Sequence, residues 1–142
     1  MRRALWLIPV AVLLAAEPSQ EVWDLFTGLA GSLSGNDASG FLSAFDRSMP
    51  GYDKLREQVT ALAGPIAVNG VRLTEIANYV DVVRDEGDAQ HRTVEVNWRM
   101  RIKRSGDATA GAAREQKIEC KLEKRGKKWK IVAMSPIEFF AP

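Results

Sequence analysis

Four side chains of this sequence could take part in acid–base chemistry. Glu75, Tyr79 and Asp81 stand at odd positions of one segment with a two-residue period, so a strand would place them on a common face. Asp46 stands apart from them, at the end of a predicted helix. A carboxylate or a phenol within hydrogen-bond reach of a substrate proton can act as a general base or acid. If the chain is an enzyme, these four residues are its candidate catalytic groups.

Whether the cluster faces a pocket depends on the turn around Gly87. An odd-numbered loop there turns one alternating set inward, namely Ile76, Asn78, Val80 and Val82. A two-residue turn would instead bury Glu75, Tyr79 and Asp81, because a one-residue slip exchanges the two faces of a strand. We favour the first register, since the second would bury two carboxylates without partners, which is energetically unfavourable.

The remaining reactive and basic residues have simpler interpretations. His91 is the single histidine and follows a turn, which is typical of an exposed hairpin residue. His91 and Cys120 lack the spacing of metal ligands, so we expect no metal site, and no cofactor-binding signature is present. The segment "KLEKRGKKWK" is interpreted as a solvated hairpin tip around Gly126 and not as a nucleic-acid surface.

The elements that must position these residues follow from the period of the apolar side chains. A helix that Ser19 can cap and Gly35 can end is followed by two more helices before Pro65. The period then falls to two and predicts strands at 71–84, 93–104, 114–124 and 128–139. The short turns between them indicate antiparallel hairpins. We therefore expect an α+β fold, with N-terminal helices packed on a curved antiparallel meander sheet.

This order of elements carries a resemblance to a known family. The segments "SGNDASGFLSAFD", "MPGYDKLREQV", "VEVNWRMRI" and "KWKIVAMSPIEFFAP" resemble, in this order, the nuclear transport factor 2-like superfamily, which includes ketosteroid isomerases and SnoaL-like polyketide cyclases. The resemblance covers about residues 18–142. It implies a cystatin-like cone whose sheet curls around a pocket covered by the helices, and a homodimer formed through the outer face of the sheet.

Alternation along the strands then indicates which side chains line the implied pocket. The expected lining, with one rim residue from the helical half, is Tyr52, Asn78, Val96, Trp98, Met100, Ile118, Cys120, Trp129 and Ile131. Cys120 alone in this set ionises, and weakly, near neutral pH. Isomerases, dehydratases and cyclases of the superfamily depend on an acid or a histidine beside the substrate. The inner face therefore disfavours catalysis.

Three functions remain open, because this superfamily holds enzymes, binding modules and interaction domains alike. The first is a non-catalytic domain that binds a small apolar ligand or a protein partner, the latter through an apolar patch around Ile137, Phe139 and Phe140. The second is a small cofactor-independent acid/base enzyme of the isomerase, dehydratase or cyclase type. The third is a structural protein whose cone is filled by its own tryptophans.

The first residues indicate export. Arg2 and Arg3 precede the apolar run Ala4–Ala16, which suits a signal peptide and is shorter than the roughly 20 residues of a membrane-spanning helix. We expect a signal peptide at 1–16 and one domain at 17–142, periplasmic or secreted, and membrane-anchored only if the leader is not cleaved. The net charge of +2 belongs to the two leader arginines, which weakens any case for a nucleic-acid partner.

Overall fold

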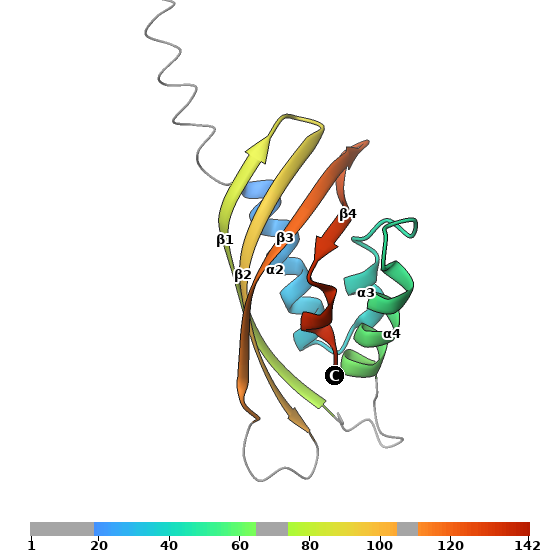
Figure 1. Ribbon diagram of the computed structural model, residues 1–142, viewed down its shortest axis with the longest axis vertical. Coiled ribbons are helices and arrows are strands. Elements are labelled where there is room, and N and C mark those ends of the chain that lie inside the picture. Colours follow the sequence, from blue (N-terminus) through green and yellow to red (C-terminus); the bar gives the residue numbers. More distant parts are fainter. Residues whose placement is uncertain (1–18, 65–73, 105–110) are drawn as a thin grey trace, which may run out of the picture.

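The computed structural model describes residues 19–64, 74–104 and 111–142, and it confirms the α+β class (Figure 1). Helices come first along the chain, and an antiparallel meander sheet that does not close on itself follows them. The predicted signal peptide and the start of the first predicted strand lie outside the described residues. None of the described helices is long and apolar enough to cross a membrane.

The helical half is built from three elements whose ends follow local chemistry. They are α2 (Gln20–Ser34), α3 (Ala38–Leu42) and α4 (Tyr52–Ala63). The hydroxyl oxygen of Ser19 caps α2 as predicted, by accepting the backbone N–H of Val22 at 3.2 Å. The carboxylate of Asp37 caps α3 by accepting the N–H of Gly40 at 2.8 Å. Gly51 begins α4 with a φ of 83°, a conformation that favours glycine.

The described strands form one sheet in chain order. They are β1 (Thr74–Gly87), β2 (His91–Arg104), β3 (Ala113–Arg125) and β4 (Lys128–Ser135), and all neighbours pair antiparallel. The prediction that the last strand reaches Phe139 is wrong. β4 ends at Ser135 because Pro136 has no N–H to donate to a strand ladder, and a short 3-10 helix, η1 (Ile137–Phe140), follows.

The side chains of η1 turn into the molecule. Ile137, Phe139 and Phe140 are all buried, so the apolar outer patch that was expected there is also wrong. The guanidinium of Arg114 on β3 holds this segment in place by donating to the backbone oxygens of Phe139 at 2.8 Å and Ala141 at 2.6 Å. The end of the described chain therefore contributes to the core and not to a binding surface.

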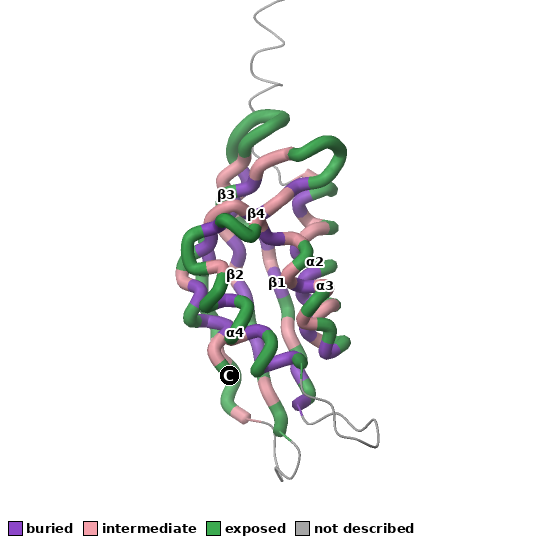
Figure 2. Tube along the Cα trace, turned by 90° about the vertical axis from the view of Figure 1, so that its right-hand side faces the viewer, coloured by how far each residue is buried: buried purple, intermediate pink, exposed green. Residues whose placement is uncertain are grey.

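Strand β1 adopts the first of the two registers considered. Ile76, Val80 and Val82 are at most 5% exposed, whereas Tyr79 is 64% exposed on the opposite face. Figure 2 shows the same alternation of buried and exposed positions along the strands. This register keeps the carboxylates of Glu75 and Asp81 on the outer face, so neither is buried without a partner.

A β-bulge at Val83 interrupts the alternation of β1 and shifts its register against β2. The bulge turns Asp85 to the inner face, where its side chain has no exposed surface. The carboxylate accepts the backbone N–H of Ser19 at 2.9 Å and pairs with Nε of Arg92 at 2.5 Å. It thus compensates the positive end of the α2 dipole and ties α2 to the β1–β2 hairpin.

Trp98 on β2 lies at the centre of the core. Its indole ring has no exposed surface and contacts four phenyl rings with centroids 5.0–6.4 Å away, those of Phe26, Phe41, Phe139 and Phe140. Burial of an indole removes roughly 150–250 Å² from water, worth about 4–6 kcal/mol of transfer free energy. These rings come from α2, α3 and η1, so one side chain of the sheet contacts three helical elements.

Asn78 on β1 provides the hydrogen-bond acceptor for the N–H of this indole. The side-chain oxygen of Asn78 accepts the Trp98 N–H at 3.0 Å. Its amide group donates to the backbone oxygen of Ala30 at 2.9 Å and to the hydroxyl of Ser34 at 2.8 Å. One amide therefore links β1, β2 and α2 inside the core.

Replacement of Asn78 tests this link. We predict that Asn78→Ala lowers the free energy of unfolding by about 1–3 kcal/mol, because the buried Trp98 N–H loses its acceptor. Asn97→Ala, which removes the same group from the outer face of β2, should change it by no more than about 0.5 kcal/mol. Urea unfolding of both variants makes the comparison, and equal losses would refute the assigned role.

The buried carboxylate of Asp85 yields a second prediction. Asp85→Ala should lower the free energy of unfolding by about 3–5 kcal/mol, because it leaves Arg92 partly buried without a counter-charge. Asp81→Ala removes a carboxylate from the outer face of the same strand and serves as the matched control. If the two variants unfold at the same urea concentration, Asp85 is not the tie between α2 and the hairpin.

Candidate functional site

The inner face of the sheet has no room for a ligand beside its central residues. Six members of the expected pocket lining have no accessible surface, so no water-sized space adjoins them: Val96, Trp98, Met100, Ile118, Cys120 and Ile131. A seventh member, Asn78, uses its side-chain amide in hydrogen bonds to Trp98 and to α2. The side chains of α2, α3 and η1 thus fill the described part of the interior.

The ionisable groups of the inner face are not poised for catalysis. Asp85 is held by Arg92 and by the start of α2. Burial raises the pKa of the Cys120 thiol far above its usual range, so the sulfur stays protonated and is a poor nucleophile. Among the described residues, no group of three His, Cys, Asp or Glu side chains is placed to hold a metal ion.

The four candidate acid–base residues do not converge. Glu75, Tyr79 and Asp81 lie on the outer face of β1, and the phenol of Tyr79 projects into solvent. Asp46 lies at the other side of the molecule, between α3 and α4. The structure therefore brings together none of the acid–base pairs that the enzyme hypothesis requires.

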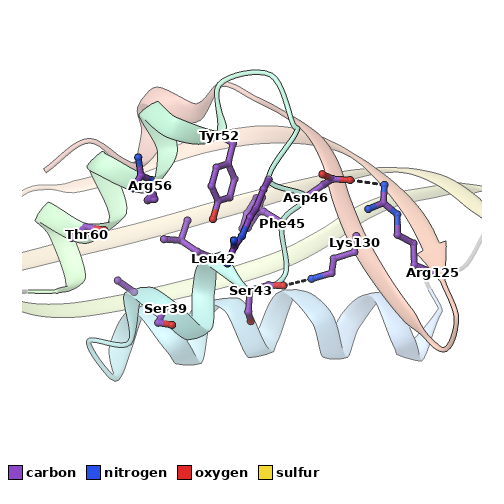
Figure 3. A pocket seen from close by; sticks show the side chains of 12 residues that line it. Ser39, Leu42, Ser43, Phe45, Asp46, Tyr52, Arg56, Thr60, Arg125 and Lys130 are labelled. Atoms are coloured by element: carbon purple, nitrogen blue, oxygen red, sulfur yellow. Dashed lines mark hydrogen bonds and ion pairs between the residues drawn. The ribbon is translucent and has the colours of Figure 1, made fainter.

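One described pocket is an open groove on the flank of the molecule, which we call the lateral groove. It has a volume of about 790 Å³ and lies between α3, α4, the segment that joins them, and the β3–β4 hairpin. In Figure 3, Leu42, Phe45 and Tyr52 occupy its middle. The figure places Arg56 on α4 at one end and Arg125 on the hairpin at the other. The groove is thus apolar along its floor and basic at its ends.

A short parallel bridge to β4 fixes the floor of the groove. Asp46 donates its backbone N–H to the oxygen of Ile131 at 2.9 Å, and Ile131 donates its own to the oxygen of Ala44 at 2.9 Å. This bridge covers part of the free edge of β4 and anchors Phe45 beside it. Tyr52, Arg56 and Thr60 then line the opposite wall because residues four apart share one face of α4.

One carboxylate and four cationic side chains line the lateral groove. The carboxylate is Asp46, and the cations are Arg47, Arg56, Arg125 and Lys130. Arg125 pairs with Asp46 at 2.5 Å, and the ammonium of Lys130 donates to the backbone oxygen of Ser43. Arg56 has only a distant contact of 3.6 Å with Asp53, and Arg47 has no hydrogen bond or ion pair within the described structure. Positive charge in the groove therefore exceeds what its carboxylate neutralises.

The charge of Asp46 is strongly stabilised. The hydroxyl and the backbone N–H of Ser48 donate to it at 2.7 and 2.8 Å, and these bonds together with Arg125 lower its pKa to about 2. A carboxylate with so low a pKa is a weak proton acceptor at neutral pH, since a general base works best with a pKa near the working pH. Asp46 therefore acts as a structural anion in the groove wall.

Comparison with solved structures identifies this architecture. A nuclear transport factor 2-like superfamily protein from Salmonella enterica superimposes with a TM-score of 0.62, at 13% identity, over 81% of this chain and 86% of that chain. The chain has the nuclear transport factor 2-like fold. A protein of unknown function with a cystatin-like fold from Nostoc punctiforme aligns over 80% of this chain and 85% of that chain, with a TM-score of 0.52 and 15% identity.

The beta subunit of the benzoate 1,2-dioxygenase from Burkholderia mallei is also similar, with a TM-score of 0.60 and 15% identity over 80% of this chain and 85% of that chain. No protein-family model matches the sequence, and no curated protein sequence matches it significantly. Proteins with the nuclear transport factor 2-like fold thus include enzyme components and proteins of unknown function, and the fold by itself selects no activity.

Within this nuclear transport factor 2-like cone, two members of the predicted lining border described pockets. Tyr52 lines the lateral groove, and Trp129 lines a smaller pocket between α2 and the β3–β4 hairpin. Three residues of the groove, Arg47, Arg56 and Arg125, were not among the predicted site residues. The spacing of Tyr52 and Arg56 indicates a shared helix face, but nothing local indicates that the hairpin tip meets this face.

The low pKa of Asp46 makes the stability of the protein depend on pH. Its carboxyl has a pKa near 2 in the folded state, below its ordinary 3.8, so its contribution is complete above about pH 5 and is lost as the pH falls toward 2. We predict that the wild type loses more stability than Asp46→Asn between these pH values. Urea unfolding at stepped pH measures both, with Asp81→Asn as control. Parallel curves for wild type and Asp46→Asn would contradict the assignment.

Proposed function

We propose that this protein is an exported, non-catalytic binding domain with the nuclear transport factor 2-like fold, and that its binding site is the lateral groove. The observation that supports the proposal is the contrast between the two possible sites. Six of the inner residues expected to line a pocket have no accessible surface, whereas the lateral groove is open and has a volume of about 790 Å³. Clefts of roughly 300–1,000 Å³ are typical of small-molecule sites.

The alternative, an acid/base enzyme, has less support. A catalytic pair needs two groups that can reach one substrate, with a pKa matched to proton transfer. Glu75, Tyr79 and Asp81 face away from the groove, and Asp46 is held as an anion by Ser48 and Arg125. The phenol of Tyr52 also lines the groove, and no base is paired with it in the described structure.

Two further parts of the proposal concern partners and location. The outer face of the sheet, through which a homodimer is expected, carries paired charges: Arg84 contacts Glu86, Glu95 and Glu119, and Arg99 contacts Glu115. Tyr79 and Val83 are the large apolar side chains exposed on the described part of this face. A pairing surface of this kind would be polar. Export rests on the leader at 1–16, which would place the groove in the periplasm or outside the cell.

A native mass spectrum of the protein, produced with its leader and purified from the exported fraction, tests the proposal. We expect an added small-molecule mass that is lost in the denatured spectrum, and a denatured chain that begins at Glu17. Ser39→Trp, which fills the groove from an exposed position on α3, should remove the added mass, whereas Ala77→Trp on the outer face should keep it.

Three results would count against parts of the proposal. Equal retention of the added mass by Ser39→Trp would place the ligand outside the lateral groove. A bare mass for the wild type, at the monomer or dimer value, would remove the small-ligand function and favour a scaffold. A purified chain that retains residues 1–16 would indicate a membrane-anchored protein and not a freely exported one.

A further inference from the structure

We infer that the lateral groove is selective for small anionic amphiphiles, molecules with one carboxylate or phosphate head group and a small apolar body. This inference rests on the proposed function, because it names the ligand class of the same groove. Two features of the groove support it, an apolar floor and an excess of cations at the rim.

The floor suits an apolar body of modest size. Leu42 and Tyr52 are half-buried, so each keeps accessible apolar surface that a ligand can cover. Phe45 lies between them and the edge of β4 and is itself almost fully buried, which makes that part of the floor rigid. An aromatic or short aliphatic body in contact with this floor gains about 25 cal/mol for each Å² of apolar surface removed from water.

The rim suits a negative head group. The negative charge of Asp46 is already paired with Arg125, and Ser48 stabilises it further with two hydrogen bonds. Arg47 remains without a partner in the described structure, and Arg56 makes one weak contact. Guanidinium groups can bind carboxylate and phosphate oxygens with two parallel hydrogen bonds. An anion is therefore attracted to the groove, and a cationic or neutral ligand of the same shape is not favoured.

The cations of the groove differ from those on the outer face of the sheet. There, Arg84 and Arg99 are engaged by glutamates of neighbouring strands. Arg101 is exposed and has no ion pair in the described structure, but it lines none of the described pockets, and its partners on the neighbouring strands are Ala77 and Ala113. Arg101 thus carries the same charge as Arg47 but does not adjoin the apolar floor of the groove. It therefore serves as a matched control.

The experiment is a titration of the purified protein followed by ¹H–¹⁵N NMR, with four probes. They are 2-naphthoate, 2-naphthyl phosphate, the neutral 2-naphthalenemethanol, and inorganic phosphate. We expect the first two to shift the amide signals of α3, α4 and the β3–β4 hairpin. The neutral probe and inorganic phosphate should each bind at least roughly fivefold more weakly, because each lacks one half of the recognition. The tighter of the two anionic probes identifies the head group.

Variants assign the charge to specific residues. The double variant Arg47→Gln/Arg56→Gln should weaken binding of the tighter anionic probe by roughly fivefold or more, while Arg101→Gln leaves it unchanged. Binding should also weaken as salt is added, since exposed charges are screened. The amide spectrum of each variant without ligand confirms that it is folded.

The outcomes separate this inference from the proposed function. If 2-naphthalenemethanol binds in the groove as tightly as 2-naphthoate, the anion selectivity is refuted and the groove remains a binding site. If inorganic phosphate binds as tightly as 2-naphthyl phosphate, the apolar part is refuted. If Arg101→Gln weakens binding as much as the double variant, the attraction is general and not local. Absence of shifts with every probe overturns the inference, while the native mass spectrum still decides the proposed function.

Discussion

The hydrogen bond between the Trp98 indole and Asn78 is the interaction on which the rest of this structure depends. A tryptophan at the centre of a curved sheet fills the space in which a cone of this type can hold a ligand, but its N–H must be paired if it is to be buried. Asn78 supplies the acceptor and at the same time binds α2 through Ala30. The helices can then close over the indole with phenyl rings, and the interior becomes a packed core.

A filled interior moves the available surface to the flank of the molecule. The bridge between Phe45 and Ile131 holds the segment after α3 against the edge of β4, and α4 follows at a distance that leaves the groove open. Its walls come from parts of the chain far apart in sequence, the helical segment around Asp46 and the hairpin around Arg125. The groove and its local excess of positive charge are therefore products of tertiary contacts.

The sequence predicted correctly those features that depend on residues close together in the chain, and it failed where the feature depends on distant ones. The cap at Ser19 and the alternation of Val94, Val96 and Trp98 are local signals, and both were read correctly. The bulge at Val83 inserts one residue without any change in composition, so the burial of Asp85 could not be anticipated. The last strand was extended too far because apolar alternation continues past Pro136, although the missing N–H ends the ladder. The groove was missed because its walls meet only in the folded chain.

The separation between core and groove has a consequence for how such a protein can change over generations. When a ligand lies inside a cone, each residue that selects it is also a core residue, and a new specificity endangers the fold. Here Arg47 and Arg56 are exposed and touch no central side chain, so their replacement leaves the packing around Trp98 intact. Surface changes of this kind have small effects on stability. Ligand preference and fold can then be selected separately, and one scaffold can acquire many specificities.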